Sequence, residues 1–144
     1  MATDSVTESI TIAADLPTVY DVVGDYESYP DWLDEFKSAE VLESYDDGWA
    51  KQVRFALSSM GLTVHMTLAY TYTDTRVDWR LVDGDMISKN DGSYDMEDNG
   101  DGTTTLTYTL EVQSNVPLPG MVRKRIAQKT VTDSLKAIKQ RAES

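Results

Sequence analysis

The 144-residue sequence contains no cysteine. This absence excludes thiol nucleophiles, thiolate metal sites and disulfide frameworks, and it agrees with a reducing compartment. No run of residues approaches the ~18 apolar positions of a membrane span. The first residues, MATD, form neither a basic leader nor the apolar core of a signal peptide. We therefore expect a cytoplasmic protein without a membrane span.

Histidine is almost as scarce, because His65 is the only one. Without a cluster of histidines or cysteines, we expect no transition-metal site. The chain also has no glycine-rich phosphate loop and no Gly-x-Ser-x-Gly nucleophile pattern, so we expect no cofactor and assign no catalytic residue. His65 shares its parity with Thr63 and Thr67, which predicts a position on the solvent face of a strand.

Basic residues are few, at 13 against 25 acidic ones, and the net charge is −12. Such an acidic surface disfavours nucleic-acid binding. Residues 120–144 nevertheless carry seven bases and two acids, a net charge of +5, which leaves −17 for the rest of the chain. The simplest interpretation is a basic helix across an acidic sheet. The alternative is contact with an acidic protein or an anionic surface through Arg123, Lys124, Arg125 and Lys129.

The few prolines and glycines mark the expected ends of helices and strands. Asp15 and Pro17 predict a short helix that ends near residue 24, and Ser28 with Pro30 predicts a second one over residues 28–36. Aspartate or asparagine followed by glycine is typical of turns between antiparallel strands. Such turns are expected at residues 47–48, 83–84, 91–92 and 99–102.

Between about residues 37 and 116, apolar and polar residues alternate. Met66, Leu68 and Tyr70, for example, are separated by Thr67 and Ala69. This pattern is typical of strands with one apolar and one solvated face. With an earlier strand that ends near residue 14, it predicts one α+β domain over residues 1–144, in which an antiparallel sheet is covered on one side only.

The C-terminal segment changes to helical spacing. Its apolar residues from Val131 to Ala142 form one stripe, whereas Val122 and Ile126 project from almost the opposite side. A bend near Gly120 is one explanation. The other is that the second half of the helix packs on the sheet while its first half faces a second apolar space.

A strongly curved sheet around a single helix fills its own concavity only if large side chains occupy it. The alternatives are a solid aromatic core and a partly hollow hydrophobic pocket. Ser59, Ser88, Asn90 and Tyr70 share the inward parity and could orient a ligand by hydrogen bonds. The residues expected to line a pocket are Trp32, Phe36, Phe55, Leu57, Met66, Leu68, Tyr70, Trp79, Asn90, Tyr94, Met96, Tyr108, Val122 and Ile126.

Several segments resemble one family. These are ITIAADLPTVYDVVGDYESYPDW (residues 10–32), SAEVL (38–42), WRLVDG (79–84) up to YDM (94–96), and VPLP (116–119) before the last helix. Together they resemble the START-like (SRPBCC) superfamily, in its bacterial polyketide cyclase/dehydrase and coenzyme Q-binding branch. The resemblance spans nearly the whole chain and implies a helix-grip (START/Bet v 1-like) fold: a curved seven-stranded antiparallel sheet around a long C-terminal helix, with two short helices after the first strand.

The resemblance implies no single activity, because this fold hosts carriers, receptors and enzymes. Aromatase/cyclase members of the family have a tyrosine at the end of the second short helix and an arginine that points inward from a central strand. Here Phe36 stands at the tyrosine's position, and the inward residues from Val64 to Tyr72 include no arginine. Both departures remove groups that could move protons or stabilise an enolate.

Three functions remain open. The favoured one is non-catalytic binding of a small hydrophobic ligand, such as a lipid, an isoprenoid, a polyketide or an aromatic metabolite. The second is a polyketide cyclase or dehydratase that relies on Tyr70 or Tyr108. The third is a protein-interaction module that uses the basic C-terminal helix.

Overall fold

The computed structural model describes residues 3–59, 61–115 and 117–144; Val116 of the VPLP segment lies outside these ranges. The described strands form one antiparallel sheet in the order β1-β7-β6-β5-β4-β3-β2. The strands are β1 (Asp4–Ile12), β2 (Phe36–Ser44), β3 (Ala50–Ser59), β4 (Leu62–Tyr72), β5 (Arg76–Gly84), β6 (Ile87–Asp98) and β7 (Thr104–Ser114). The helices are α1 (Leu16–Gly24), η1 (Tyr26–Ser28, a 3-10 turn), α2 (Tyr29–Trp32) and α3 (Gly120–Glu143).

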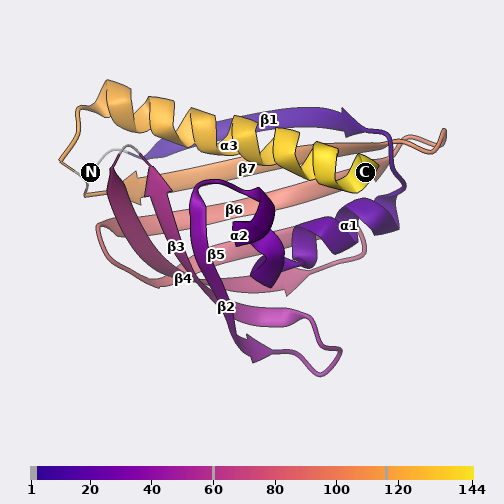
Figure 1. The fold of residues 1–144 in the computed structure, drawn as a ribbon, viewed down its shortest axis with the longest axis horizontal. Helices are drawn as coiled ribbons and strands as arrows, with labels where there is room; N and C mark the ends of the chain where they lie inside the picture. Colours follow the sequence, from indigo (N-terminus) through magenta and orange to yellow (C-terminus); the bar gives the residue numbers. More distant parts are fainter. Residues whose placement is uncertain (1–2, 60, 116) are drawn as a thin grey trace.

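Helix α3 lies along one face of the sheet, closest to β1 and β7, and its C-terminal end passes over α1 (Figure 1). The short helices α1 and α2 cover the same face beside it (Figure 1). This arrangement confirms the predicted seven-stranded antiparallel sheet with a long C-terminal helix and two short helices after the first strand.

The two halves of α3 differ in how they meet the sheet. The stripe from Val131 to Ala142 is buried, with Val131 and Ile138 fully excluded from solvent. In the first half only Ala127 is buried among the described side chains, and Met121 is 73% exposed. Hydrophobic burial therefore anchors the C-terminal half. The N-terminal half carries no comparable stripe of buried apolar side chains.

The first short helix starts as the sequence predicts. Asp15 is extended, and its Oδ1 accepts a hydrogen bond of 3.0 Å from the backbone N–H of Thr18, while Pro17 occupies the first turn. Val19 and Val23 are fully buried on the inner side of α1. The predicted end near residue 24 is also confirmed.

The predicted second helix over residues 28–36 is wrong in its extent. Helix α2 ends at Trp32, because Leu33 is extended (φ −111°, ψ 105°), and Phe36 begins β2. The Ser28 side chain makes no capping hydrogen bond, since the preceding 3-10 turn already leads into the helix. Phe36 instead packs edge-on against Tyr29 and Phe55, with ring centroids 5.3 Å away in both cases.

Two of the four predicted turns are misplaced. Gly84 still belongs to β5, and the chain reverses one residue later at Asp85 and Met86. Residues 91–92 lie in the middle of β6, where Gly92 pairs with Trp79 on one side and Leu110 on the other. The glycine is needed here for space: a Cβ on Gly92 would lie 2.4 Å from the Trp79 ring and 2.6 Å from the Thr109 carbonyl oxygen.

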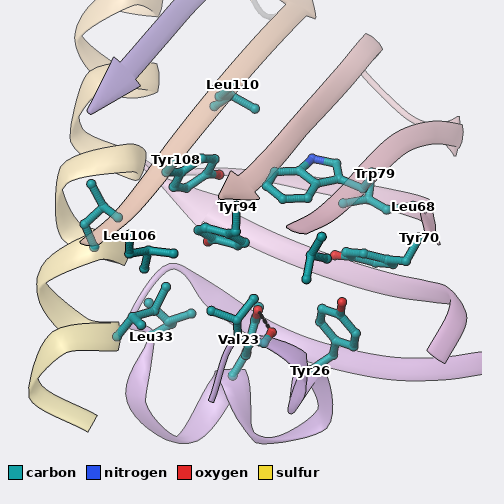
Figure 2. Packing of buried hydrophobic residues seen from close by; sticks show 14 of the residues in the cluster. Val23, Tyr26, Leu33, Leu68, Tyr70, Trp79, Tyr94, Leu106, Tyr108 and Leu110 are labelled. Atoms are coloured by element: carbon teal, nitrogen blue, oxygen red, sulfur yellow. Dashed lines mark hydrogen bonds between the residues drawn. The ribbon is translucent and has the colours of Figure 1, made fainter. Parts of the chain in front are cut away.

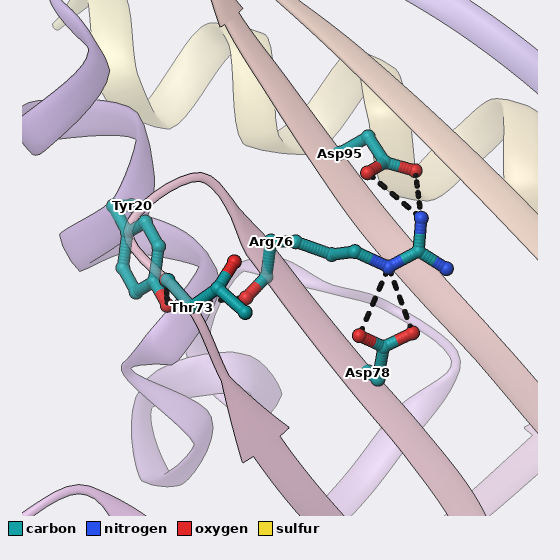
Figure 3. A network of polar contacts seen from close by, with 5 residues as sticks. All are labelled: Tyr20, Thr73, Arg76, Asp78 and Asp95. Carbon is teal, nitrogen blue, oxygen red and sulfur yellow. Dashed lines mark hydrogen bonds and ion pairs between the residues drawn. The ribbon is translucent and has the colours of Figure 1, made fainter.

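An ion-pair network lies on the outer face of the sheet, at the start of β5 and next to the β4–β5 turn (Figure 3). The Arg76 guanidinium donates to both carboxylate oxygens of Asp78 and of Asp95 at 2.9 Å. These exposed pairs contribute little stability individually. The Tyr20 hydroxyl of α1 donates to the carbonyl of Thr73 at 2.6 Å, so the hairpin also positions α1.

Replacing Gly92 by alanine should destabilise the fold by about 1–3 kcal/mol, because the added methyl group overpacks against a backbone carbonyl and a buried indole. Denaturant unfolding measures the change. Gly120→Ala is the matched control, since its new methyl group would meet only the flexible end of Arg123, at 3.3 Å. Equal stability of the two variants would contradict the close packing of Trp79 on Gly92.

Candidate functional site

The space beneath the first half of α3 contains a cavity of about 130 Å³, which we call the outer cavity. Its walls are mainly aliphatic and come from β3, β4, β6, β7 and α3. Arg123, Ile126, Ala127 and Thr130 form its helical side. The helix therefore presents a second stripe to this space, next to the stripe that packs on the sheet.

A smaller space of about 50 Å³, the inner pocket, lies beside the outer cavity. Its aromatic end is formed by Tyr94 and Tyr108, with ring centroids 4.6 Å apart, and by Trp79, 5.1 Å from Tyr94 (Figure 2). The two spaces are contiguous, because both are lined by Leu57, Met66, Asn90, Leu110 and Thr130.

Asn90 is the polar residue shared by the two spaces on the sheet side, and its hydrogen bonds are made within the protein. Its Oδ1 accepts from the Trp79 indole N–H at 3.0 Å, and its Nδ2 lies 3.2 Å from the Met66 sulfur. These contacts hold the Trp79 ring across Gly92. Asn90 thus fixes the boundary between the outer cavity and the aromatic inner pocket.

Glu35 enters the outer cavity from the loop before β2. Its backbone carbonyl accepts from the Ser58 N–H at 2.8 Å, which ties the loop to β3. Its carboxylate Oε2 accepts from the Thr130 hydroxyl of α3 at 3.0 Å. The other oxygen, Oε1, is 3.5 Å from the Lys129 ammonium nitrogen, but it is buried without a hydrogen-bond partner among the described residues.

Arg123 enters the same cavity from the first turn of α3. Its Nε is buried and, within the described ranges, also lacks a hydrogen-bond partner. Glu35 and Arg123 therefore place a carboxylate and a guanidinium in the lining of one mainly apolar space, although Glu35 Oε1 and Arg123 Nε themselves have essentially no exposed surface. The charge of Glu35 also reaches the phenol of Tyr108, whose pKa is raised first by burial and second by this carboxylate.

The sequence-predicted lining residues divide into two groups. Trp32, Met96 and Val122 do not line either space: Trp32 packs edge-on against Tyr29, Met96 is buried in the core, and Val122 is half-buried on α3. Their expected position in the pocket is wrong. The remaining residues line one or both spaces, and their part in binding a ligand stays a prediction. They are Phe36, Phe55, Leu57, Met66, Leu68, Tyr70, Trp79, Asn90, Tyr94, Tyr108 and Ile126.

The inward parity assigned to Ser88 is also wrong. A register irregularity between Ile87 and Lys89 shifts the alternation by one residue, so Ile87 is buried and Ser88 is exposed. The Ser59 side chain lies outside the described part of the structure. His65 does lie on the solvent face, where it pairs with Asp85 at 3.2 Å.

Sequence reasoning missed the polar residues of the site, Glu35 and Arg123. Glu35 lies in a loop, where no periodicity assigns it a direction. Composition alone groups Arg123 with the basic face of the last helix. The spacing of Arg123, Ala127 and Thr130, at intervals of four and three residues, is the signal that could have placed it on a second buried stripe.

The structure also divides the predicted basic surface. Lys124 and Arg125 are exposed, whereas Arg123 points into the outer cavity. Lys129 pairs with Asp133 on its own helix at 2.5 Å. The four bases therefore do not form one continuous solvent-facing set.

Comparison with known families decides the family of this chain. A model of the family described as polyketide cyclase/dehydrase and lipid transport matches residues 3–143. The chain belongs to this family. The match confirms the resemblance seen in the sequence, and with the fold it indicates a hydrophobic-ligand-binding architecture.

Solved structures show the same fold. A START superfamily protein from Mycobacterium smegmatis is 28% identical with a TM-score of 0.87, over 96% of this chain and 97% of that one. A protein from Thermus thermophilus is 23% identical with a TM-score of 0.82, over 96% of both chains. The Zhui aromatase/cyclase from a Streptomyces species is 17% identical with a TM-score of 0.77, over 99% and 94%. The search of curated proteins gives no match.

Other features of this polyketide cyclase/dehydrase family member bear on its chemistry. Within residues 3–59, 61–115 and 117–144, no group of three histidine, cysteine or acidic side chains is placed to hold a metal ion. In the same part of the chain, no helix has the length and apolar character that a membrane crossing needs.

Buried tyrosines that line the inner pocket, and Tyr26 beside them, are held in their neutral form. Burial, reinforced by neighbouring tyrosines, raises the pKa of Tyr26, Tyr29, Tyr70 and Tyr94 well above the ordinary value. At neutral pH these phenols are hydrogen-bond donors and acceptors, and they are poor bases. Tyr70 therefore does not supply the missing base of a cyclase by itself.

These shifts predict that the buried phenols ionise in a separate, later stage of an alkaline titration. The unfolded phenol titrates near pH ~10, and the folded pKa is higher, so the stability from neutral phenols is complete below ~10 and falls as pH rises above it. Phenolate absorbance and circular dichroism, followed together, should show the buried phenols ionising only as the fold is lost. The chain unfolded in guanidinium, which titrates in one stage, is the control. Complete ionisation with unchanged dichroism would contradict the burial.

Proposed function

We propose that this protein binds a small hydrophobic molecule between the sheet and the first half of α3, without catalysing a reaction on it. The candidates are a lipid, an isoprenoid, a polyketide or an aromatic metabolite. The observation that carries the proposal is the outer cavity of about 130 Å³, which is walled mainly by aliphatic side chains and continues toward an aromatic pocket. Such apolar concavities with a few polar groups are typical of ligand sites.

The size of the cavity limits the size of the ligand that this conformation holds. Ligand pockets are usually ~300–1,000 Å³, whereas an apolar cavity of ~150 Å³ is enough for benzene. At about 130 Å³, the cavity in this conformation is near the lower limit for one ring or a short chain. A longer ligand requires the first half of α3 to move away, and this half has few buried side chains to hold it.

Filling the cavity tests this function directly. Ala127→Leu places a larger side chain into the outer cavity from α3 and should weaken the binding of toluene at least about tenfold, because the added carbons occupy the ligand's volume. Isothermal titration calorimetry gives the affinity. Gln128→Leu adds a leucine to the exposed side of the same helix and should bind toluene as the unmodified protein does.

Two outcomes contradict the proposal. In the first, the unmodified protein binds no toluene; in the second, Ala127→Leu and Gln128→Leu bind it equally, which places the binding elsewhere. Extraction of the protein purified from its native cells into organic solvent, followed by mass spectrometry, identifies the natural ligand.

A second candidate is a cyclase or dehydratase that acts on a polyketide. The observation that favours it is the carboxylate of Glu35 beside the same cavity as the Arg123 guanidinium, since a base and a cationic hydrogen-bond donor are the groups that enolisation uses. Turnover of a poly-β-ketone that disappears in Glu35→Gln, with binding retained, would support this enzyme. Absence of turnover with ligand bound leaves the binding function.

A further inference from the structure

A second concave surface lies between the start of α1, the β2–β3 turn and the β4–β5 turn. We call it the aromatic cleft, and its volume is about 440 Å³. Among the described residues, it shares none of its lining with the outer cavity or the inner pocket. It is therefore a separate surface, to which the binding of a hydrophobic ligand assigns no role.

Three aromatic rings form one continuous wall of this cleft. The ring centroid of Trp49 lies 5.3 Å from that of Tyr20, at an interplanar angle of 84°, and 5.4 Å from that of Tyr72, at 49°. The Tyr20 hydroxyl donates to the carbonyl of Thr73 at 2.6 Å (Figure 3), and the Tyr72 hydroxyl donates to that of Ala50 at the same distance. The three side chains are only half-buried, so the wall keeps ring surface open to solvent.

The indole at the centre of this wall is held by the fold. A Cβ on Gly24 would collide with the Trp49 ring, so the indole packs directly on the backbone at the end of α1. The Trp49 N–H donates to Asp47 Oδ1 at 3.0 Å, and the Trp49 carbonyl accepts from the Tyr45 N–H at 2.8 Å. The wall therefore needs little ordering when a ligand binds, which favours affinity.

Three carboxylates border the same cleft. Asp21, Asp47 and Asp74 line it and are exposed, and its lining within the described ranges includes no lysine or arginine. Their charge acts on the aromatic wall, because the pKa of Tyr20 is raised first by burial and then by Asp74 and Asp47. The positive end of the α1 dipole also borders the cleft, but the Asp15 carboxylate caps it. The aromatic surface therefore lies in a negative potential.

We propose that the aromatic cleft binds a small, free alkylammonium compound, whose cationic head lies against Tyr20, Trp49 and Tyr72. The electron-rich faces of aromatic rings attract cations, and aromatic surfaces are the usual recognition elements for quaternary ammonium groups. The methyl groups of such a head bury apolar area on the rings, while the carboxylates of Asp21, Asp47 and Asp74 complement its charge. This site goes beyond the proposed function and does not depend on it.

The lining favours this class of ligand over three others. A metal ion is disfavoured, because no group of three acidic or histidine side chains in the described part of the chain is placed to hold one. An anion would meet three carboxylates of like charge. A bare ammonium group is strongly hydrated, whereas an alkylated one already carries apolar groups that fit the rings.

Matched probes test the role of charge. Choline has a trimethylammonium head, and 3,3-dimethyl-1-butanol is its neutral isostere. Dissociation constants come from nuclear magnetic resonance titrations of the intact protein at low ionic strength, followed at the Trp49 indole N–H and at the ligand methyl groups. We expect saturable shifts and choline binding at least about fivefold tighter than that of the alcohol. Phosphocholine should bind more weakly than choline, because its phosphate meets the carboxylates.

Substitutions test the assigned residues. The double variant Asp21→Asn/Asp74→Asn removes two exposed charges and should weaken choline at least about twofold, with the alcohol unaffected. Asp83→Asn, exposed near the opposite end of β5, is the matched control and should change neither affinity. Trp49→Leu removes the central ring and should lower the preference for choline over the alcohol. The two carboxylate substitutions keep the test decisive if Trp49→Leu does not fold.

Each contrary result overturns the proposal in its own way. Absence of saturable shifts with choline, or equal affinity for choline and the alcohol, removes the cation site. Choline affinity that is equal in the double variant and in Asp83→Asn places the cation elsewhere. Tighter binding of phosphocholine than of choline favours a lipid head group over a free cation. The proposed binding of a hydrophobic ligand stands or fails separately, on toluene in the outer cavity.

Discussion

The architecture depends on one geometric constraint: one long helix, with two short helices beside it, must cover the concave apolar face of a seven-stranded sheet. Burial of apolar area drives the helices and the sheet together, but α3 carries a continuous apolar stripe only from Val131 to Ala142. Over that half the core is closed. Over the first half, the helix presents one large apolar side chain, Ile126, together with Arg123, Ala127 and Thr130, which are small or polar, and the outer cavity remains.

The aromatic residues set the depth of this cavity. The rings of Trp79, Tyr94 and Tyr108 pack at centroid distances of 4.6–5.5 Å and close the inner end. The packing depends on Gly92, where the absence of a Cβ lets the indole lie across β6. The bond from Trp79 to Asn90 then holds the ring in place. The same side chains that stabilise the sheet thus decide how far a ligand can enter.

Periodicity predicted much of the fold because it records which face of an element is buried. The alternation along the strands, the cap at Asp15 and the stripe of α3 each gave a correct element. Periodicity and turn motifs failed where the local sequence pattern does not match the backbone geometry. Asp91-Gly92 has turn chemistry, but Gly92 serves close packing inside a strand, and one irregularity near Ser88 reversed the parity of that segment.

The polar part of the site was out of reach for a different reason. Glu35 lies in a loop, and its direction is set by contacts to Ser58 and Thr130, which are distant in the sequence. Arg123 has the composition of a surface residue and is brought inward only by the position of α3 on the sheet. Family membership supplied the fold but left these two residues unassigned, because the family motifs are patterns of apolar, proline and aromatic residues.

The central claim is that the concavity is hollow beneath the first half of α3 and solid beneath the second. Methyl nuclear magnetic resonance under xenon tests it most directly, because xenon enters dry apolar cavities. The account predicts saturable shifts at Leu57, Met66 and Ile126, which line the hollow part, and none at Leu106, Val131 and Ile138 in the closed core. Equal shifts at both sets, or none at either, would contradict it.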